Sequence, residues 1–331
     1  MTGPPRHWTR RGIVAWALLP VSLIFLAVSV VRRVLYRVGL LPQTRLRVPV
    51  VVVGNLVAGG TGKTPVVIAL VAVLQAAGRK PGVVSRGFGG AATSPMGVTP
   101  ATDPAVAGDE PVLIAQRCGC PVWIGRRRAE AAAALIATHP ECDIIVCDDG
   151  MQHYAIAREL EIAVFDERGI GNGWPLPAGP LRELPSRIGG VDFVLFHGIN
   201  DSPIAHPRAF SFALAGSEFH ALGGGSRVAA ATDFAGKRVA AVAGIGNPQR
   251  FFANLLALGI EADCRAFPDH HRFAKEDLVF AGAEAILMTE KDAVKCGSFA
   301  LPDCWALRVN AELPPAFIAG VLERLDGRKI A

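Results

Sequence analysis

A glycine-rich loop that ends in lysine follows a run of β-branched residues near the start of the chain. The β-branched run covers residues 48–53, the loop covers residues 54–65, and an apolar stretch covers residues 66–74. The order of strand, glycine loop and helix is typical of a phosphate-binding loop, in which backbone N–H groups and the positive end of the helix dipole face an anion. The segment therefore predicts a nucleotide site in a P-loop NTPase-like α/β/α core.

Two side chains at the end of this loop carry the expected chemistry. Lys63 is expected to reach the β- and γ-phosphates, and the Thr64 hydroxyl is expected to bind Mg²⁺. The strict motif requires glycine at position 57, where the chain has Val57. A plain glycine-rich turn is the alternative, but it leaves Lys63 without a role. The residues expected to bind the nucleotide are Asn55, Gly59, Gly60, Thr61, Gly62, Lys63 and Thr64.

An uncharged apolar segment at residues 13–31 precedes the loop. As a helix it would be roughly 28 Å long, close to the hydrocarbon thickness of a bilayer. Arginines flank both of its ends, so the positive-inside rule does not decide its orientation. The nucleotide site that follows favours a body on the cytoplasmic side. Two other interpretations are a helix lying in the interface, which tolerates Pro20, and a cleaved signal peptide, which would export the site away from ATP.

Charge and cysteine usage limit the partners and the compartment. Eight of the 34 basic residues lie within residues 1–47, which contain no acidic residue. The remainder holds 26 basic and 29 acidic residues, a net charge of −3. The basic end suits anionic lipid headgroups and gives no footprint for nucleic acid. The seven cysteines form no C-x-x-C pair, which indicates reduced thiols and neither a disulfide framework nor a zinc site.

Alternating strand and helix patterns predict a parallel sheet with helices on both faces. The expected strands are 48–53, 82–86, 121–124, 143–148 and 161–165, and the expected helices are 63–77, 111–117 and 127–138. A second alternating run follows the glycines at 223–225, with strands at 238–243, 262–267 and 285–288 and a helix at 248–258. We expect an anchoring segment at 1–42, a kinase-type domain at 43–225 and a smaller α/β domain at 226–331. Residues 87–108, which follow a strand, are expected to form a mobile lid.

Further candidate residues follow the ends of strands. An apolar strand ends in Asp148 and Asp149, as an acidic metal-organising strand of a phosphate-loop enzyme does. Asp109 opens a helix and is equally compatible with a helix cap and with a catalytic group. The sequence Asp269-His270-His271 fits a surface loop or an acid/base group better than a metal site. The turn at 244–248 lacks the third glycine of a dinucleotide-binding loop, so a tight turn is favoured.

These blocks together resemble the tetraacyldisaccharide 4′-kinase family of lipid A biosynthesis. The resemblance spans nearly the whole chain, and its order and spacing are highly specific. One departure is Met151, where the family usually has phenylalanine, a change in packing. The matching blocks are the N-terminal apolar helix, 54–65, Ser85-Arg86-Gly87-Phe88, Gly108-Asp109-Glu110-Pro111, 148–153, 176–183, Phe267-Pro268-Asp269-His270-His271 and Thr289-Glu290-Lys291-Asp292-Ala293.

The resemblance implies an activity and a place in the cell. It implies ATP-dependent phosphorylation of the 4′-hydroxyl of a tetraacylated glucosamine disaccharide 1-phosphate, which yields lipid IVA, at the cytoplasmic face of a Gram-negative inner membrane. It also implies two α/β/α domains joined by a short β linker, with the active site between them. The expected cofactors are ATP and Mg²⁺, the expected partners are the lipid substrate and the membrane, and no protein partner is required.

The resemblance also assigns roles to residues of this chain. Asp109 would accept the proton of the sugar hydroxyl with His270 as its partner, and Lys63 would act on the phosphates. Thr64, Glu110 and Asp149 would bind Mg²⁺. The residues that match acceptor-binding positions are Arg128, Asp148, Gln152, His153, Arg182 and Glu183.

Two other classes of protein use similar loops. Membrane-recruited partitioning ATPases carry an extra lysine directly before the glycine pair, where this chain has Ala58. A non-enzymatic scaffold that binds nucleotide only for stability is the other class, and a single-turnover assay with labelled ATP separates it from a kinase.

Overall fold

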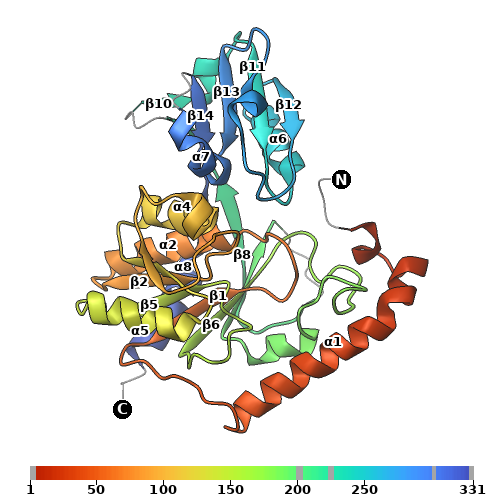
Figure 1. Ribbon diagram of the computed structural model, residues 1–331, viewed down its shortest axis with the longest axis vertical. Coiled ribbons are helices and arrows are strands. Elements are labelled where there is room, and N and C mark those ends of the chain that lie inside the picture. Colours follow the sequence, from red (N-terminus) through yellow and green to blue (C-terminus); the bar gives the residue numbers. More distant parts are fainter. Residues whose placement is uncertain (1–4, 199–203, 223–226, 300–302, 328–331) are drawn as a thin grey trace.

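The computed structural model describes all residues except 1–4, 199–203, 223–226, 300–302 and 328–331. The two sheets form a larger and a smaller body, and a long N-terminal helix lies along the larger one (Figure 1). The expected α/β fold with parallel sheets and an N-terminal apolar helix is confirmed. The glycine run at 223–225, expected to separate the domains, lies outside the described residues.

The larger sheet has nine strands in the order β15-β8-β7-β6-β1-β5-β2-β4-β3. All neighbours from β8 to β4 are parallel, and the edge strands β15 and β3 are antiparallel. The centre of the sheet is β1, and its four valines are almost fully buried, because helices cover both faces. The strands are β1 (Val50–Gly54), β2 (Pro81–Ser85), β3 (Met96–Val98), β4 (Val122–Ile124), β5 (Ile144–Asp148), β6 (Leu160–Phe165), β7 (Phe193–His197), β8 (Ala209–Ala215) and β15 (Asn310–Glu312).

Helices cover this sheet on two sides and form two apolar cores. One core contains α2 (Lys63–Ala76), α4 (Asp109–Cys118) and α8 (Pro315–Asp326). The other contains α5 (Arg128–Thr138) and the short helix η2 (Pro185–Gly190). This sandwich holds the carboxyl ends of β1, β2 and β5 at one edge of the sheet, where ligands bind in open α/β folds.

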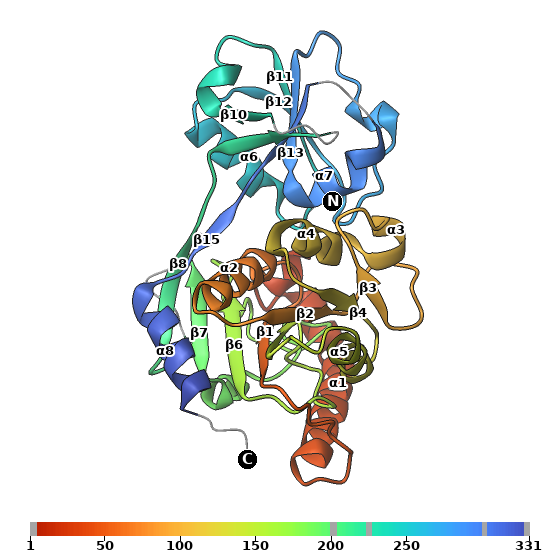
Figure 2. The same cartoon turned by 90° about the vertical axis from the view of Figure 1, so that its left-hand side faces the viewer.

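The C-terminal segment returns to the larger body. Strand β15 pairs with β8, and in α8 the ring of Phe317 lies 5.4 Å from that of Phe193. The expected boundary at 225/226 assigns residues 310–326 to the smaller domain, whereas their pairing and packing place them with the larger one. Figure 2 shows β8 and β15 running side by side toward the smaller body.

The smaller sheet has six strands in the order β10-β9-β14-β13-β11-β12. Strand β11, next to the edge strand β12, is buried along its length and pairs in parallel with β12 and β13. The strands are β9 (Glu218–Ala221), β10 (Val228–Ala230), β11 (Val239–Ala243), β12 (Ala262–Ala266), β13 (Ala285–Thr289) and β14 (Cys304–Leu307). The helices are α6 (Pro248–Ala257) and α7 (Glu290–Cys296), with short 3-10 turns η3 (Ala231–Phe234), η4 (Lys275–Leu278) and η5 (Gly297–Phe299).

The segment 87–108, expected to form a mobile lid, includes short regular elements. It contains β3 and α3 (Pro104–Ala107), and backbone hydrogen bonds join Ala91 and Ala92 to α3. A Cβ at Gly90 would lie 2.4 Å from the carbonyl oxygen of Val106, so the chain packs tightly here. Strand β3 spans three residues, too few for an alternating pattern to be visible in the sequence.

The N-terminal helix α1 (Ile13–Arg37) follows the short turn η1 (Arg6–Trp8) and is longer than its uncharged segment. It is long and apolar enough to cross a membrane by length and composition. Only Ala15 and Ser22 are buried, and they lie seven residues apart on one face. The other side is largely apolar and exposed, as Ile13 at 89% and Ile24 at 67% illustrate.

Candidate active site

The phosphate loop connects the end of β1 to the start of α2. Gly59 and Gly62 have φ values of 98° and 82°, which residues with a side chain rarely adopt. Glycine at both positions therefore allows the loop to curl over the helix N-terminus. Beneath the loop, the buried amide of Asn55 donates to Gly59 O at 3.3 Å and to Thr61 Oγ1 at 3.1 Å. Asn55 therefore braces the loop from below, whereas the other six expected nucleotide-binding residues line the cavity.

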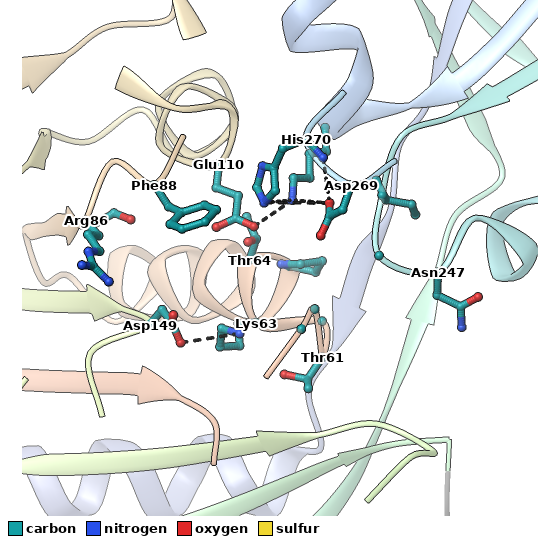
Figure 3. A pocket seen from close by; sticks show the side chains of 18 of the residues that line it. Thr61, Lys63, Thr64, Arg86, Phe88, Glu110, Asp149, Asn247, Asp269 and His270 are labelled. Carbon is teal, nitrogen blue, oxygen red and sulfur yellow. Dashed lines mark hydrogen bonds and ion pairs between the residues drawn. The ribbon is translucent and has the colours of Figure 1, made fainter. Parts of the chain in front are cut away.

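Lys63 and Asp149 face each other across the cavity floor. The ammonium of Lys63 lies 3.6 Å from Asp149 Oδ1, as Figure 3 shows. On its other side Asp149 pairs with Arg182 at 3.0 Å. Burial would raise the pKa of Asp149, but Lys63, Arg182 and Arg128 outweigh it and lower the pKa to about 2. Asp149 is therefore a fixed anion beside the phosphate loop.

Asp148, its neighbour at the end of β5, is enclosed. It is 1% exposed, and Oδ2 accepts a hydrogen bond from Ser85 Oγ at 3.1 Å. Burial, followed by the charges of Glu110 and Asp149, raises the pKa of Asp148 to about 7. Its Oδ1 has no hydrogen-bond partner within the described part of the chain. The two adjacent carboxyls thus differ strongly in their preference for the charged form.

Asp109 of the larger domain and His270 of the smaller domain contact each other. His270 Nδ1 lies 3.0 Å from Asp109 Oδ2 and 3.2 Å from Oδ1. Burial would raise the pKa of Asp109, but His270 and Lys291 outweigh it, so the pKa is lowered. The same hydrogen bond raises the pKa of His270 against burial and Lys291. The N-cap of α4 is Gly108, while Asp109 Oδ1 also accepts from Glu110 N at 2.9 Å, so pairing with His270 and support of the first helical turn coexist.

Lys291 is a cavity residue to which the sequence assigned no role. Its ammonium lies 3.0 Å from Glu110 Oε1, 3.4 Å from Asp269 Oδ1 and 4.0 Å from Asp109 Oδ2. Burial would lower its pKa, but these three carboxylates outweigh burial and raise it. Lys291 therefore stays charged and links an acidic cluster drawn from both domains. In the sequence, Lys291 belongs to the Thr289–Ala293 block that matches the family. A matching block does not show which residues of the other domain it faces.

The expected acceptor residues form two layers. Gln152, Arg182 and Glu183 line the cavity. Arg128 is buried: its backbone N–H donates to His153 Nε2 at 3.2 Å, and its Nη2 donates to the Asp149 carbonyl oxygen at 2.8 Å. Burial, with Arg128 and Arg158 nearby, lowers the pKa of His153 to about 4, so this imidazole is neutral and accepts that bond. The inner layer thus holds the backbone of Asp149, whose carboxylate pairs with Arg182 at the cavity.

The cavity has a volume of about 1120 Å³, slightly more than a typical small-molecule site. Helix α1 contributes a wall of four residues, and the larger body contributes the phosphate loop. The smaller domain contributes its 245–247 turn, α6, residues 269–270 and the start of α7. The lining residues from α1, which the sequence did not single out, are Phe25, Val28, Ser29 and Arg32.

A family model described as tetraacyldisaccharide-1-P 4′-kinase matches residues 14–326. The chain belongs to this family. A tetraacyldisaccharide 4′-kinase from Azoarcus sp. (strain BH72) is 51% identical over 98% of this chain and 96% of its own. The kinase of the same name from Pasteurella multocida is 45% identical over 97% of this chain and 98% of its own. The family resemblance stated from the sequence is therefore confirmed.

A solved structure shares the fold of this family member. The crystal structure of LpxK from Aquifex aeolicus in complex with ATP superposes with a TM-score of 0.80 and covers 95% of this chain and 100% of that chain. Its sequence is 24% identical, so the likeness establishes the shared architecture.

The cavity of this tetraacyldisaccharide-1-P 4′-kinase family member contains oxygen donors of the kind that Mg²⁺ takes. The described residues contain no group of three or more His, Cys, Asp or Glu that could hold a metal ion. Mg²⁺ in kinase sites takes only one or two carboxylates and completes its shell with phosphate oxygens and water. Thr64 and Glu110 lie between Lys63 and His270 in Figure 3, and Asp149 borders the same space, so oxygen donors of the right kind are present.

Proposed function

We propose that this chain transfers the γ-phosphoryl group of ATP to the 4′-hydroxyl of a tetraacylated glucosamine disaccharide 1-phosphate. The observation that carries the proposal is one cavity that joins Lys63 of the phosphate loop, His270 of the smaller domain and the wall formed by α1. A nucleotide, a proton acceptor and a lipid thus meet at one place. Phosphoryl transfer needs mainly such positioning and charge neutralisation.

The phosphate loop and its neighbours would bind the donor. The loop amides and Lys63 would hold the β- and γ-phosphates, in place of the carboxylate that Lys63 now contacts. Thr64, Glu110 and Asp149 would hold Mg²⁺, which neutralises charge between the phosphates. Asp149 suits this role because its pKa is held at about 2, so it remains an anion at any physiological pH.

The opposite wall would bind the acceptor. Arg182, held by Asp149 at 3.0 Å and by Gln152 Oε1 at 3.4 Å, presents a guanidinium suited to phosphate or sugar oxygens. Glu183 accepts a hydrogen bond from Tyr154 at 2.7 Å, which fixes its carboxylate beside the cavity. Arg128, His153 and Asp148 would act from beneath, around Asp149, which pairs with Arg182. Arg128 and Asp148 are buried and none of the three lines the cavity, which favours a supporting role over direct contact.

The Asp109–His270 pair would take up the proton of the sugar hydroxyl. His270 lines the cavity, whereas Asp109 is 5% exposed and bonded to Nδ1. Asp109, kept an anion by its lowered pKa, would accept the proton as the oxygen attacks the γ-phosphorus. The hydrogen bond to His270 Nδ1 would place the carboxylate and tune it as a base.

The membrane contact of α1 would lie in the plane of the cytoplasmic interface of the inner membrane. Near one end of α1 the rings of Trp16 and Trp174 lie 4.7 Å apart, and near the other end those of Tyr36 and Tyr154 lie 6.1 Å apart. These contacts are twenty residues apart on the helix, or about 30 Å. A bilayer crossed by α1 would separate Trp174 from Tyr154, which belong to one body. The exposed apolar side and the flanking arginines suit an interfacial helix.

Mass spectrometry of the lipid product tests the proposed reaction. Purified protein, ATP, Mg²⁺ and the disaccharide 1-phosphate acceptor in mixed micelles should give a product heavier by one phosphate. A single-turnover assay with γ-labelled ATP should move the label to the lipid. ATP binding without label transfer would support a nucleotide-binding scaffold and reject the kinase proposal.

A further inference from the structure

Helix α1 and the residues just before it are attached to residues 172–182, which we name the bridging segment. Ahead of the helix, the indole Nε1 of Trp8 donates to the Pro177 carbonyl oxygen at 3.0 Å, and Arg11 Nε donates to Asn172 O at 3.0 Å. Within the helix, the hydroxyl of Ser22 accepts the backbone N–H of Ala178 at 2.9 Å. The attachment is polar and directional, whereas membrane anchoring requires only apolar surface and charge.

The other side of the bridging segment is attached to the phosphate loop. Ala58 N donates to Pro180 O at 2.8 Å, and Arg182 N donates to Leu56 O at 2.7 Å. Leu181, fully buried, forms an antiparallel bridge with Val57. The segment ends in Arg182, which lines the cavity and pairs with Asp149. A continuous set of hydrogen bonds therefore connects α1, Arg182 and the phosphate loop.

Ser22 is the polar centre of the attachment. It is 0% exposed in a helix whose other side chains are mostly exposed, and its hydroxyl also donates to Leu18 O at 3.2 Å. Ala178 is fully buried as well, so its N–H relies on Ser22 in place of water. A buried N–H that loses its acceptor is costly, and the chain around it shifts to reduce that cost.

We infer that Ser22 is a positioning residue for the acceptor site. It fixes the bridging segment against α1, and thereby sets where Arg182 stands relative to the phosphate loop and the membrane surface. The inference rests on the proposed kinase function and goes beyond it, because α1 becomes part of the active-site framework as well as an anchor.

The test is Ser22→Ala, which makes α1 more apolar and removes only the hydroxyl. We expect vesicle flotation equal to that of the wild type, and a KM for the lipid acceptor raised about 10-fold in mixed micelles, as for a lost buried hydrogen bond. The Kd for ATP should change less than the acceptor KM, because the loop keeps its own contacts with Pro180 and Arg182. Hydrogen exchange at the Ala178 amide should become faster.

The matched control is Leu23→Ala, at a neighbouring position that is 55% exposed and does not line the cavity. It should weaken flotation on vesicles and leave the acceptor KM in micelles and the exchange at Ala178 unchanged. A wild-type KM and wild-type exchange in Ser22→Ala would overturn the inference, and so would a loss of activity that merely follows a loss of flotation. Absence of lipid phosphorylation by the wild type would instead reject the kinase function, while the exchange measurement still reports on Ser22.

Discussion

The imidazole of His270 in the smaller domain lies 3.0 Å from the carboxylate of Asp109 in the larger domain. Each partner comes from a different domain, so the pair depends on how the two domains dock. Lys291 of the smaller domain reaches Glu110 of the larger one in the same cluster. The proposed proton acceptor and the contact between the domains therefore share one set of side chains.

A kinetic double-mutant cycle tests Asp109 and His270 as a unit. Asp109→Asn keeps the hydrogen bond to Glu110 N but removes the anion, and turnover should fall by roughly 10²–10⁴. His270→Ala should also slow turnover, and the double variant should lose less than the product of the single losses. The control is His271→Ala, because His271 Nε2 lies 2.9 Å from Asp277 Oδ2 and takes no part in the Asp109–His270 pair. Fully multiplicative losses would reject the coupled pair, and an active Asp109→Asn protein would reject a role for the carboxylate charge.

The pKa of His270 should respond to its partner. The bond to Asp109 raises this pKa above the ordinary value of 6.5, against burial and Lys291. In Asp109→Asn the largest raising cause is gone, while burial and Lys291 still lower the pKa of His270. The midpoint should therefore drop, as NMR titration of the imidazole can measure. The charged pair stabilises the contact between the two domains at pH values between the two folded pKa values. That contribution is lost as pH rises through the raised pKa of His270, and again as pH falls through the lowered pKa of Asp109. An unchanged midpoint in the variant would contradict the assignment.

The phosphate loop lysine should be indispensable for turnover. Lys63→Ala removes a positioned charge from the phosphates and should reduce kcat by roughly 10²–10³. It also leaves Asp149 with Arg182 as its remaining close cation, so the fold should persist. Thr64→Ala should likewise abolish most turnover. Lys80→Ala, at an exposed position just before β2, is the control and should keep wild-type rates. Near-wild-type turnover by folded Lys63→Ala protein would refute the proposed mechanism.

The elements that could be predicted from the sequence are those that local residue patterns encode. The β1–loop–α2 unit and β5 were predicted because apolar runs of strand length precede glycines or carboxylates. The C-terminal return was not predicted, because β15 has three residues and its place depends on pairing with β8, nearly a hundred residues earlier. Short edge strands carry too little periodicity to be assigned from one sequence.

The site was predictable to a similar extent. Lys63 and Thr64 follow from the loop itself, whereas the direction in which Asn55 and Asp148 face depends on packing, and both are buried. Lys291 and Arg32 reach the cavity only because the smaller domain and α1 dock against the larger body. Such approaches are tertiary facts that local spacing does not contain.

Lys291 should control closure of the cleft. Lys291→Met would leave Asp109, Glu110 and Asp269 facing one another without the ammonium they share, and their repulsion should favour an open cleft. We expect kcat to fall by roughly 10-fold or more and small-angle scattering to show a larger radius of gyration. Lys291→Arg, which keeps the charge, should recover part of both. Lys275→Met, at an exposed position in the same domain, is the control. An unchanged radius together with unchanged kcat would remove Lys291 from the mechanism.

Replacement of α1 separates anchoring from catalysis. Removal of residues 1–37 should leave a body that still binds ATP, because the phosphate loop and its bracing residue Asn55 are intact. Lipid phosphorylation should fall even in mixed micelles, where membrane binding is not limiting, because α1 forms one wall of the cavity. An unrelated interfacial helix fused in its place should restore vesicle flotation but not the acceptor KM. If that fusion phosphorylates lipid as well as the wild type, α1 serves only as an anchor. Circular dichroism and the Kd for ATP check that each variant is folded before its rates are compared.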